Sequence, residues 1–336
     1  MSLLRVAVIG AGNIAQRHLQ VLTAHPGCEV VLLCDLDPVT RAETAKRFEI
    51  PEQVETTNAV VQRDDIDAVF VLVSVTAMAA VATGFLDAGL PTFLEKPPGL
   101  YSTDTARLAE VAERRGAMAM VGLNRRFYAS HLEIRQRLAD DTPLATVTVE
   151  AHEDLARLPE KWKATRGSEI PAVVLRRWAI ANGIHALDLL RFFGGEVAEV
   201  HSAVHDRFEH GFPDANTAVL RFANGTHGRA LMDWMAPGNH RFELRGVGVR
   251  ATSQPGFGTT MLAQRGEAEV RLEPDADDLK FKPGFWKQDS AFLESVRQGV
   301  VPQSPAATLA DAHRTMVLIE QICQLPDRQS VRAPDA

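Results

Sequence analysis

The sequence contains few of the residues that mark disulfide-rich or zinc-binding proteins. Its 336 residues include only three cysteines, Cys28, Cys34 and Cys323, and none of them has C-x-x-C spacing. We therefore expect reduced, structural thiols in a cytoplasmic protein. The first ten residues lack a signal-peptide cleavage site and already read as a strand, so they are not interpreted as a secretion signal.

An excess of positive charge is also missing. The chain has 36 Lys and Arg against 43 Asp and Glu, a net charge of −7, and no basic stripe, which argues against a nucleic-acid partner. No apolar run approaches the length of a membrane span, so no membrane association is expected. G-x-S-x-G and H-E-x-x-H are absent, and the histidines outside the site discussed below, such as His18 and His25, lack metal-ligand spacing. We predict no metal site and interpret these histidines as surface or packing residues.

What is present points to a dinucleotide. The run LLRVAVI predicts a strand buried on both faces, and it leads directly into a G-x-G-x-x-A segment. Gly10 permits a tight turn, Gly12 lets a pyrophosphate approach the backbone, and Ala15 lets the next helix pack on the sheet. The N-terminus of that helix offers N–H groups and a positive dipole end to the phosphates.

A second apolar run, residues 30 to 34, ends on Asp35, about 20 residues beyond the last glycine. An acid at this place accepts hydrogen bonds from ribose hydroxyls and repels the 2′-phosphate of NADP. We therefore predict NAD as the cofactor. Arg41 is near enough in sequence to keep NADP as the alternative.

The strand and helix patterns define two regions. They alternate up to Leu123, which predicts an α/β Rossmann domain with a doubly wound parallel sheet over residues 1–123. Residues 124–336 instead show alternating strands with short turns, which predicts an α+β domain with an open, mostly antiparallel sheet. Within it, the polar residues 153–175 are expected to form a long loop, residues 184–193 an apolar helix, and residues 327–336 a loosely held tail.

Lys96 is the first candidate for chemistry. It follows the predicted strand 92–95 in the sequence Glu95-Lys96-Pro97-Pro98, and ligands of open parallel sheets bind at that edge. Its ammonium could hydrogen-bond a substrate hydroxyl and stabilise the alkoxide that forms as hydride leaves. A solvent-exposed lysine in a turn is the structural alternative.

His185 and Asp188 form the second candidate. They are three residues apart, so on a helix they share one face. A histidine near a bound alcohol can take or return its proton at neutral pH, and Asp188 could orient it or bind a sugar hydroxyl. The structural alternative is a helix-end histidine held by its own aspartate.

Other polar residues could border the site or could be solvated linker residues. Asn124 and Arg125 lead out of the first domain, and Trp162-Lys163 and Arg176-Arg177-Trp178 flank the polar loop as a possible substrate lid. The full predictions are as follows: catalytic Lys96, His185 and Asp188; cofactor-binding Gly10, Gly12, Asn13, Ile14, Ala15, Asp35, Glu95, Lys96, Asn124 and Arg125; substrate-contacting Lys163, Arg177, Trp178 and Asn182.

Together these motifs resemble the Gfo/Idh/MocA oxidoreductase family. The resemblance rests on the fingerprint, Asp35, Glu95-Lys96-Pro97, the G-x-N-R-R-F stretch from Gly122 and the H-x-x-D-L-L-R helix from His185. It implies nicotinamide-dependent oxidation or reduction of a sugar, polyol or sugar derivative, with Lys96 as the catalytic lysine and His185 as the proton relay. It also implies association through the open sheet, so we expect a homodimer or homotetramer.

Two departures from the family pattern keep other functions open. Ala181 stands where many members have an aspartate four residues before the histidine, so either Asp188 or Asn182 substitutes for it or the proton relay is weaker. Val75 and Ala79 replace a P-x-x-x-H segment. The alternatives are an isomerase, lyase or hydrolase that recycles tightly bound NAD, and a non-catalytic dinucleotide-binding regulator.

Overall fold

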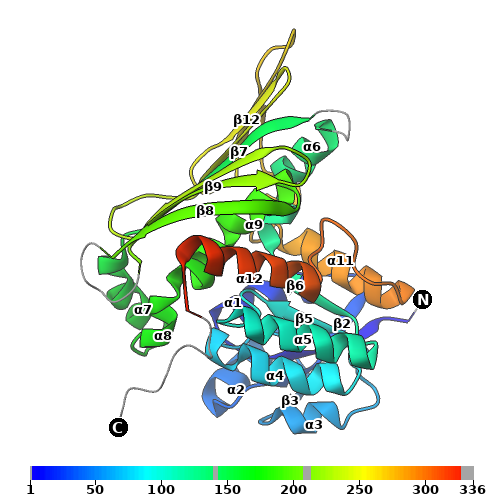
Figure 1. Cartoon of the computed structure of the whole chain (residues 1–336). Coiled ribbons are helices and arrows are strands. Elements are labelled where there is room, and N and C mark those ends of the chain that lie inside the picture. The colour runs from blue at the N-terminus through cyan, green and yellow to red at the C-terminus, as the bar shows by residue number, and fades with distance from the viewer. Residues whose placement is uncertain (1, 139–142, 207–212, 327–336) are drawn as a thin grey trace, which may run out of the picture. The chain divides into compact units, whose positions relative to one another are not determined.

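The computed structural model describes residues 2–138, 143–206 and 213–326 (Figure 1). The chain divides into two compact units: Met1–Phe127 with Ala276–His313, and Tyr128–Asp275 with Arg314–Ala336. This division differs from the predicted boundary at residue 123, which left residues 276–313 in the second domain. Those residues belong to the first unit because α11 (Phe285–Gln298) packs on α1 (Asn13–Leu22). The predicted tail at 327–336 lies outside the described residues.

The first unit contains a six-stranded parallel sheet, as predicted. Its strand order is β3-β2-β1-β4-β5-β6. The chain adds β2 and β3 on one side of β1 and then β4, β5 and β6 on the other, so the strand order reverses between β1 and β4. Ligands of such sheets bind at the carboxyl ends of the strands where the order reverses. The strands are β1 (Leu4–Ile9), β2 (Cys28–Cys34), β3 (Glu52–Val54), β4 (Ala68–Val71), β5 (Thr92–Glu95) and β6 (Ala119–Gly122).

The helices that connect the strands cover both faces of this sheet. Because parallel crossovers are right-handed, the reversal puts α1 and α2 on one face and α4 and α5 on the other. Accordingly, α1 packs with α11, and α4 packs with α5. The helices are α2 (Pro38–Arg47), α3 (Thr57–Val61), α4 (Val75–Asp87), α5 (Ser102–Arg115) and α10 (Ala276–Lys280), followed by α12 (Leu309–Cys323), which begins in this unit.

Local sequence signals set the ends of these helices. α2 begins where Asp37 accepts hydrogen bonds from the backbone of Val39 and Thr40. α5 begins at Ser102, after the N-cap residue Tyr101, and Asp104 accepts from the Tyr101 N–H at 3.1 Å. An acid in the first turn thus satisfies a backbone N–H at the start of α5.

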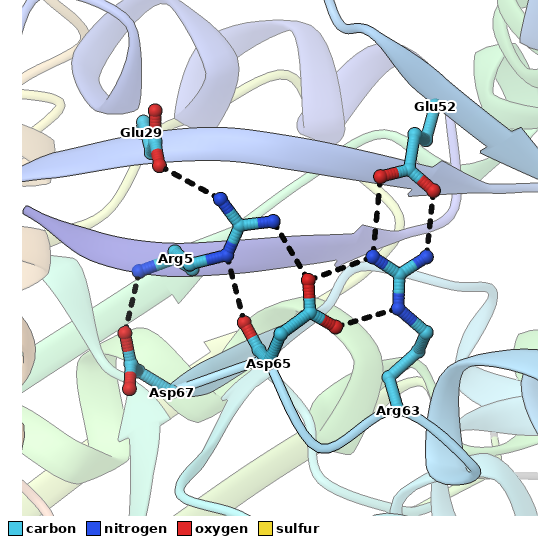
Figure 2. A network of polar contacts seen from close by, with 6 residues as sticks. All are labelled: Arg5, Glu29, Glu52, Arg63, Asp65 and Asp67. Carbon is cyan, nitrogen blue, oxygen red and sulfur yellow. Dashed lines mark hydrogen bonds and ion pairs between the residues drawn. The ribbon is translucent and has the colours of Figure 1, made fainter.

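An ionic network holds the amino-terminal edge of the same sheet (Figure 2). Asp65 accepts from Arg5 Nη2 at 2.7 Å and from Arg63 Nε at 2.6 Å, and Arg63 also forms two bonds to Glu52. These two arginines hold the pKa of Asp65 well below its usual range. The network lies at the amino ends of the strands, whereas Gly10 lies at their carboxyl ends. The network is therefore remote from the edge where ligands of such sheets bind.

The second unit contains an eight-stranded, mostly antiparallel sheet, again as predicted. The order is β14-β13-β12-β11-β7-β10-β9-β8, and only the β7–β10 pair is parallel. α9 (Ile184–Gly194) packs on β7, β10 and β11. The strands are β7 (Leu144–His152), β8 (Val197–His205), β9 (Ala215–Phe222), β10 (His227–Asp233), β11 (Arg241–Gly246), β12 (Val249–Ser253), β13 (Thr260–Gln264) and β14 (Val270–Leu272).

The predicted loop at 153–175 was wrong. It contains a short 3-10 turn (Leu155–Arg157), α7 (Leu158–Arg166) and α8 (Ala172–Arg176). The stretch contains Pro159 and Pro171, and proline is compatible with a loop but is also tolerated at helix starts; each lies at the beginning of one of these helices. Within the described residues, no helix is long and apolar enough to cross a membrane.

Candidate cofactor and catalytic site

The turn after β1 requires a glycine. Gly10 has a φ of +99°, and a Cβ atom there would lie 2.7 Å from the carbonyl oxygen of Leu72. Its N–H donates to the Cys34 carbonyl at 2.7 Å, and the Leu72 N–H donates to Ile9. Gly10 therefore joins the carboxyl ends of β1, β2 and β4 at the point where the strand order reverses.

Gly12 has a different reason to be glycine. Its φ is an ordinary −69°, and a Cβ atom there would meet no described protein atom within 4 Å. Protein packing would therefore tolerate a side chain at this position and does not explain the glycine. A pyrophosphate that approaches the backbone would need the open space. Gly12 is also the N-cap of α1 and, as a glycine, supplies no side-chain cap to this helix end. The arrangement fits a dinucleotide whose phosphates lie at the N-terminus of α1.

Asp35 is fixed against this turn. Its Oδ2 accepts the Ala11 N–H at 2.7 Å, and its Oδ1 accepts the Asp37 N–H at 2.8 Å. Each carboxylate oxygen retains acceptor capacity, so the group can also bind ribose hydroxyls. Arg41 donates to the carbonyl oxygen of Asp35, which places a guanidinium at the same strand end.

Lys96 follows β5 on the same carboxyl edge and is partly buried. Asn124, which follows β6, is buried and donates its amide to the Pro283 carbonyl at 2.9 Å, so it holds the segment before α11. Arg125 is partly exposed in the 3-10 helix Asn124–Phe127. The first unit thus places Gly12, Asp35 and Lys96 on one edge, whereas a contact of Asn124 or Arg125 with the cofactor stays a prediction.

Glu95 lies in a buried charged group that the sequence did not reveal. It is 4% exposed, and its Oε1 lies 3.7 Å from Nε2 of His18, a fully buried residue of α1. The other ring nitrogen of His18 lies 2.8 Å from Oδ2 of Asp289 in α11. His18 was expected at the surface or in packing. No sequence signal links it to Asp289, 271 residues away, or to Glu95.

The carboxylates change the protonation of His18. Burial alone would lower the pKa of His18, but attraction to Asp289 and Glu95 overrides this and raises the pKa to about 9. Burial would raise the pKa of Glu95, yet the nearby imidazole of His18, 3.7 Å away, and the charge of Lys96 bring this pKa below its usual value. His18 is therefore an imidazolium at neutral pH, and Glu95 is ionised.

His185 and Asp188 are both buried in α9. The hydroxyl of Thr315 donates to Asp188 Oδ1 at 3.1 Å and accepts from Arg191 Nη1 at 2.8 Å. Asp188 is therefore tied to α12 as well as sharing a helix face with His185. Within the described residues, no group of His, Cys, Asp or Glu could hold a metal ion.

The predicted substrate residues fall into three environments. Lys163 is exposed and pairs with Glu169. Arg177 is buried, where it pairs with Glu320 and donates to a backbone carbonyl, so we do not retain it as a substrate contact. Trp178 Nε1 and Asn182 Nδ2 both donate to Glu153 Oε2, at 2.8 and 2.5 Å. Glu153 was also missed, since it stood in the supposed loop.

Comparison with known proteins agrees with this arrangement. Residues 4–123 match the family described as "Oxidoreductase family, NAD-binding Rossmann fold", and residues 146–251 match the "GFO/IDH/MocA C-terminal domain". The chain belongs to the Gfo/Idh/MocA oxidoreductase family. It therefore has an NAD-binding Rossmann domain, as the sequence predicted.

Several relatives are dehydrogenases. The chain is 29% identical to inositol 2-dehydrogenase of Acidothermus cellulolyticus over 64% of its own length and 61% of that relative, which is less than two thirds of it. It is 24% identical to trans-1,2-dihydrobenzene-1,2-diol dehydrogenase of Bos taurus over 95% and 96% of the two chains. Among solved structures, levoglucosan dehydrogenase in complex with NADH has a TM-score of 0.79 at 17% identity, covering 96% of each chain.

Proposed function

We propose that this protein is an NAD-dependent dehydrogenase of a cyclic polyol, sugar or related diol. Three observations support the proposal: open space at Gly12, a carboxylate at the ribose position, and Lys96 on the same sheet edge. The relatives named above act on inositol, a dihydrodiol or levoglucosan, all of which are ring alcohols. Lys96 is the observation that carries the proposal, because a dinucleotide sensor would not need an ammonium there.

In this proposal each side chain has one task. The backbone at Gly10 to Asn13 binds the pyrophosphate, and Asp35 binds the adenosine ribose. When bound, the nicotinamide supplies the site that accepts or donates hydride. Lys96 hydrogen-bonds the reacting oxygen and stabilises its negative charge, and His185 takes the hydroxyl proton during oxidation and returns it during reduction. Asp188, held by Thr315, orients His185.

Substrate contacts are also part of the proposal. The carboxylate of Glu153 fixes both Trp178 and Asn182, which lie just before His185 in the chain. An indole and an amide held in this way offer one apolar face and one hydrogen-bonding group to a ring alcohol. Assembly through the sheet of the second unit into a dimer or tetramer, and a cytoplasmic location, are likewise proposed.

The test uses purified protein, NAD and a panel of inositols, aldoses, anhydrosugars and cyclic diols. Formation of NADH with a member of the panel supports the dehydrogenase. If the protein instead copurifies with NAD that resists dialysis, and substrate changes without net NADH, the internally recycled cofactor is favoured. If it binds NADH but converts no compound either way, it is a regulator.

A further inference from the structure

The buried group of His18, Glu95 and Asp289 has no task in the proposed reaction. Its members come from α1, the end of β5 and α11, so one imidazole joins the helix that follows the fingerprint to the strand that bears Lys96. Both ring nitrogens face a carboxylate, at 2.8 and 3.7 Å. Two carboxylates beside a histidine favour its charged form, against the effect of burial.

The three side chains of this group are shielded from water. The side chains of His18 and Asp289 are fully buried, and that of Glu95 is 5% exposed. Rings of Phe285, Phe93 and Phe70 enclose the imidazole, with centroids 4.6, 5.2 and 5.9 Å away. In such surroundings a carboxylate keeps its charge only beside a cation, so the ionisation of Glu95 depends on its neighbours.

Stability alone is a poor explanation for the group. A buried ion pair adds little net stability over apolar residues of the same volume, because desolvation offsets the attraction. What the group does fix is the charge and the orientation of Glu95. That carboxylate is adjacent in sequence to Lys96, whose ammonium acts on it electrostatically.

We propose that His18 is a positioning residue that, through Glu95, sets the charge and placement of Lys96. The inference rests on the proposed function of Lys96. The charged groups around this histidine include the following: His18 faces Asp289 and Glu95, Glu95 also faces Lys96 and Lys282, and Asp289 also acts on Cys28. Arg17 and Arg125 in turn act on Lys282. Without the imidazolium, Glu95 takes up a proton, and Lys96 loses the anion beside it.

The experiment measures how the reactivity of Lys96 depends on pH. Acetic anhydride acetylates only the neutral amine, and mass spectrometry of the Lys96 peptide gives the midpoint. We expect His18→Gln to lower this midpoint by about one pH unit, because an ion-pair partner is lost. Binding of NADH should be retained, since the Gly12 backbone and Asp35 are unchanged. A midpoint that stays the same or rises overturns the proposal.

Two comparisons make the result specific. Arg63→Gln perturbs the ionic network at the opposite edge of the same sheet and must leave the Lys96 midpoint unchanged (Figure 2). Glu95→Gln must lower the midpoint as His18→Gln does, and the double variant must lower it no further. Additive shifts would show that His18 does not act through Glu95. Acetylation of Lys96 does not require turnover. The midpoint can therefore be measured even if the proposed dehydrogenase function is wrong.

A second measurement covers the case in which His18→Gln does not fold. Nitrogen NMR of the histidine-labelled wild-type protein at pH 8 must show His18 protonated on both ring nitrogens. A neutral His18 at pH 8 contradicts the proposal.

Discussion

The carboxylate of Asp35 accepts the backbone N–H of Ala11 at 2.7 Å, which couples the end of β2 to the fingerprint turn. The same group that would read the ribose therefore also fixes the loop that would hold the pyrophosphate. Two requirements of dinucleotide binding meet in one side chain. A change at Asp35 should consequently affect both the affinity for the cofactor and the choice between NADH and NADPH.

We predict that Asp35→Ser weakens NADH binding by roughly tenfold or more, because it removes the two carboxylate oxygens that accept hydrogen bonds. NADPH binding should weaken less, because the variant also removes the charge that repels a 2′-phosphate. Arg41, whose guanidinium donates to the carbonyl oxygen of residue 35, would remain at that strand end. Asp37→Asn is the matched control, since Asp37 caps α2 and is not placed at the ribose. Tryptophan fluorescence titrations give both affinities, and an unchanged ratio in Asp35→Ser would contradict this role.

Two glycines should respond in opposite ways. Gly12→Val adds a side chain in open space, so the free energy of unfolding should change little while NADH binding is lost. Gly10→Ala forces a Cβ against the Leu72 carbonyl at positive φ, which should cost about 1–3 kcal/mol of stability. Thermal unfolding with and without NADH distinguishes the two effects. A strongly destabilised Gly12→Val would mean that packing explains this glycine.

Because of His18, we expect the free energy of unfolding to fall at alkaline pH. The pKa of His18 in the folded state is about 9, above the ordinary 6.5, so the folded protein holds this proton more tightly than the unfolded chain. The stabilisation is complete below about pH 6.5 and is lost as the pH rises towards 9. Denaturant unfolding from pH 6 to 10 should show this decline. In His18→Gln the decline should be absent, and an equal decline in the variant would assign it to another group.

His185 should matter for turnover and not for the cofactor. His185→Asn removes the proton relay and should lower kcat by roughly 10²- to 10⁴-fold with NADH affinity retained. Thr315→Val removes the hydroxyl that holds Asp188 and should give a smaller loss together with a shifted pH profile. Steady-state rates across pH test both. A Thr315→Val profile identical to wild type would separate Asp188 from the relay.

The parts of the fold that follow from local pattern were predictable. Gly10, Asp35 and Lys96 could be placed because each directly follows a buried strand, and parallel strands bring their carboxyl ends to one edge. Asn-Gly is likewise a hairpin signal in the sequence, and β9 and β10 pair antiparallel around the turn that contains Asn224-Gly225.

Other features depend on contacts between distant parts of the chain. His18 and Asp289 are separated by 271 residues, and neither position shows a local pattern that would pair them. Residues 276–313 follow the second sheet in sequence but pack in the first unit, which no periodicity reveals. Helices α7 and α8 were missed because Pro159 and Pro171 are compatible with both a loop and a helix start.

Turnover by Lys96→Met, compared with wild type, tests the central claim most directly. Methionine keeps the length of the side chain and removes the ammonium. With NAD and the compound that the wild-type protein oxidises, the account predicts that Lys96→Met still binds NADH but forms NADH at least about 10²-fold more slowly. Turnover equal to wild type, or a wild-type protein that binds NADH and oxidises no ring alcohol, would contradict the claim that Lys96 makes this chain a dehydrogenase.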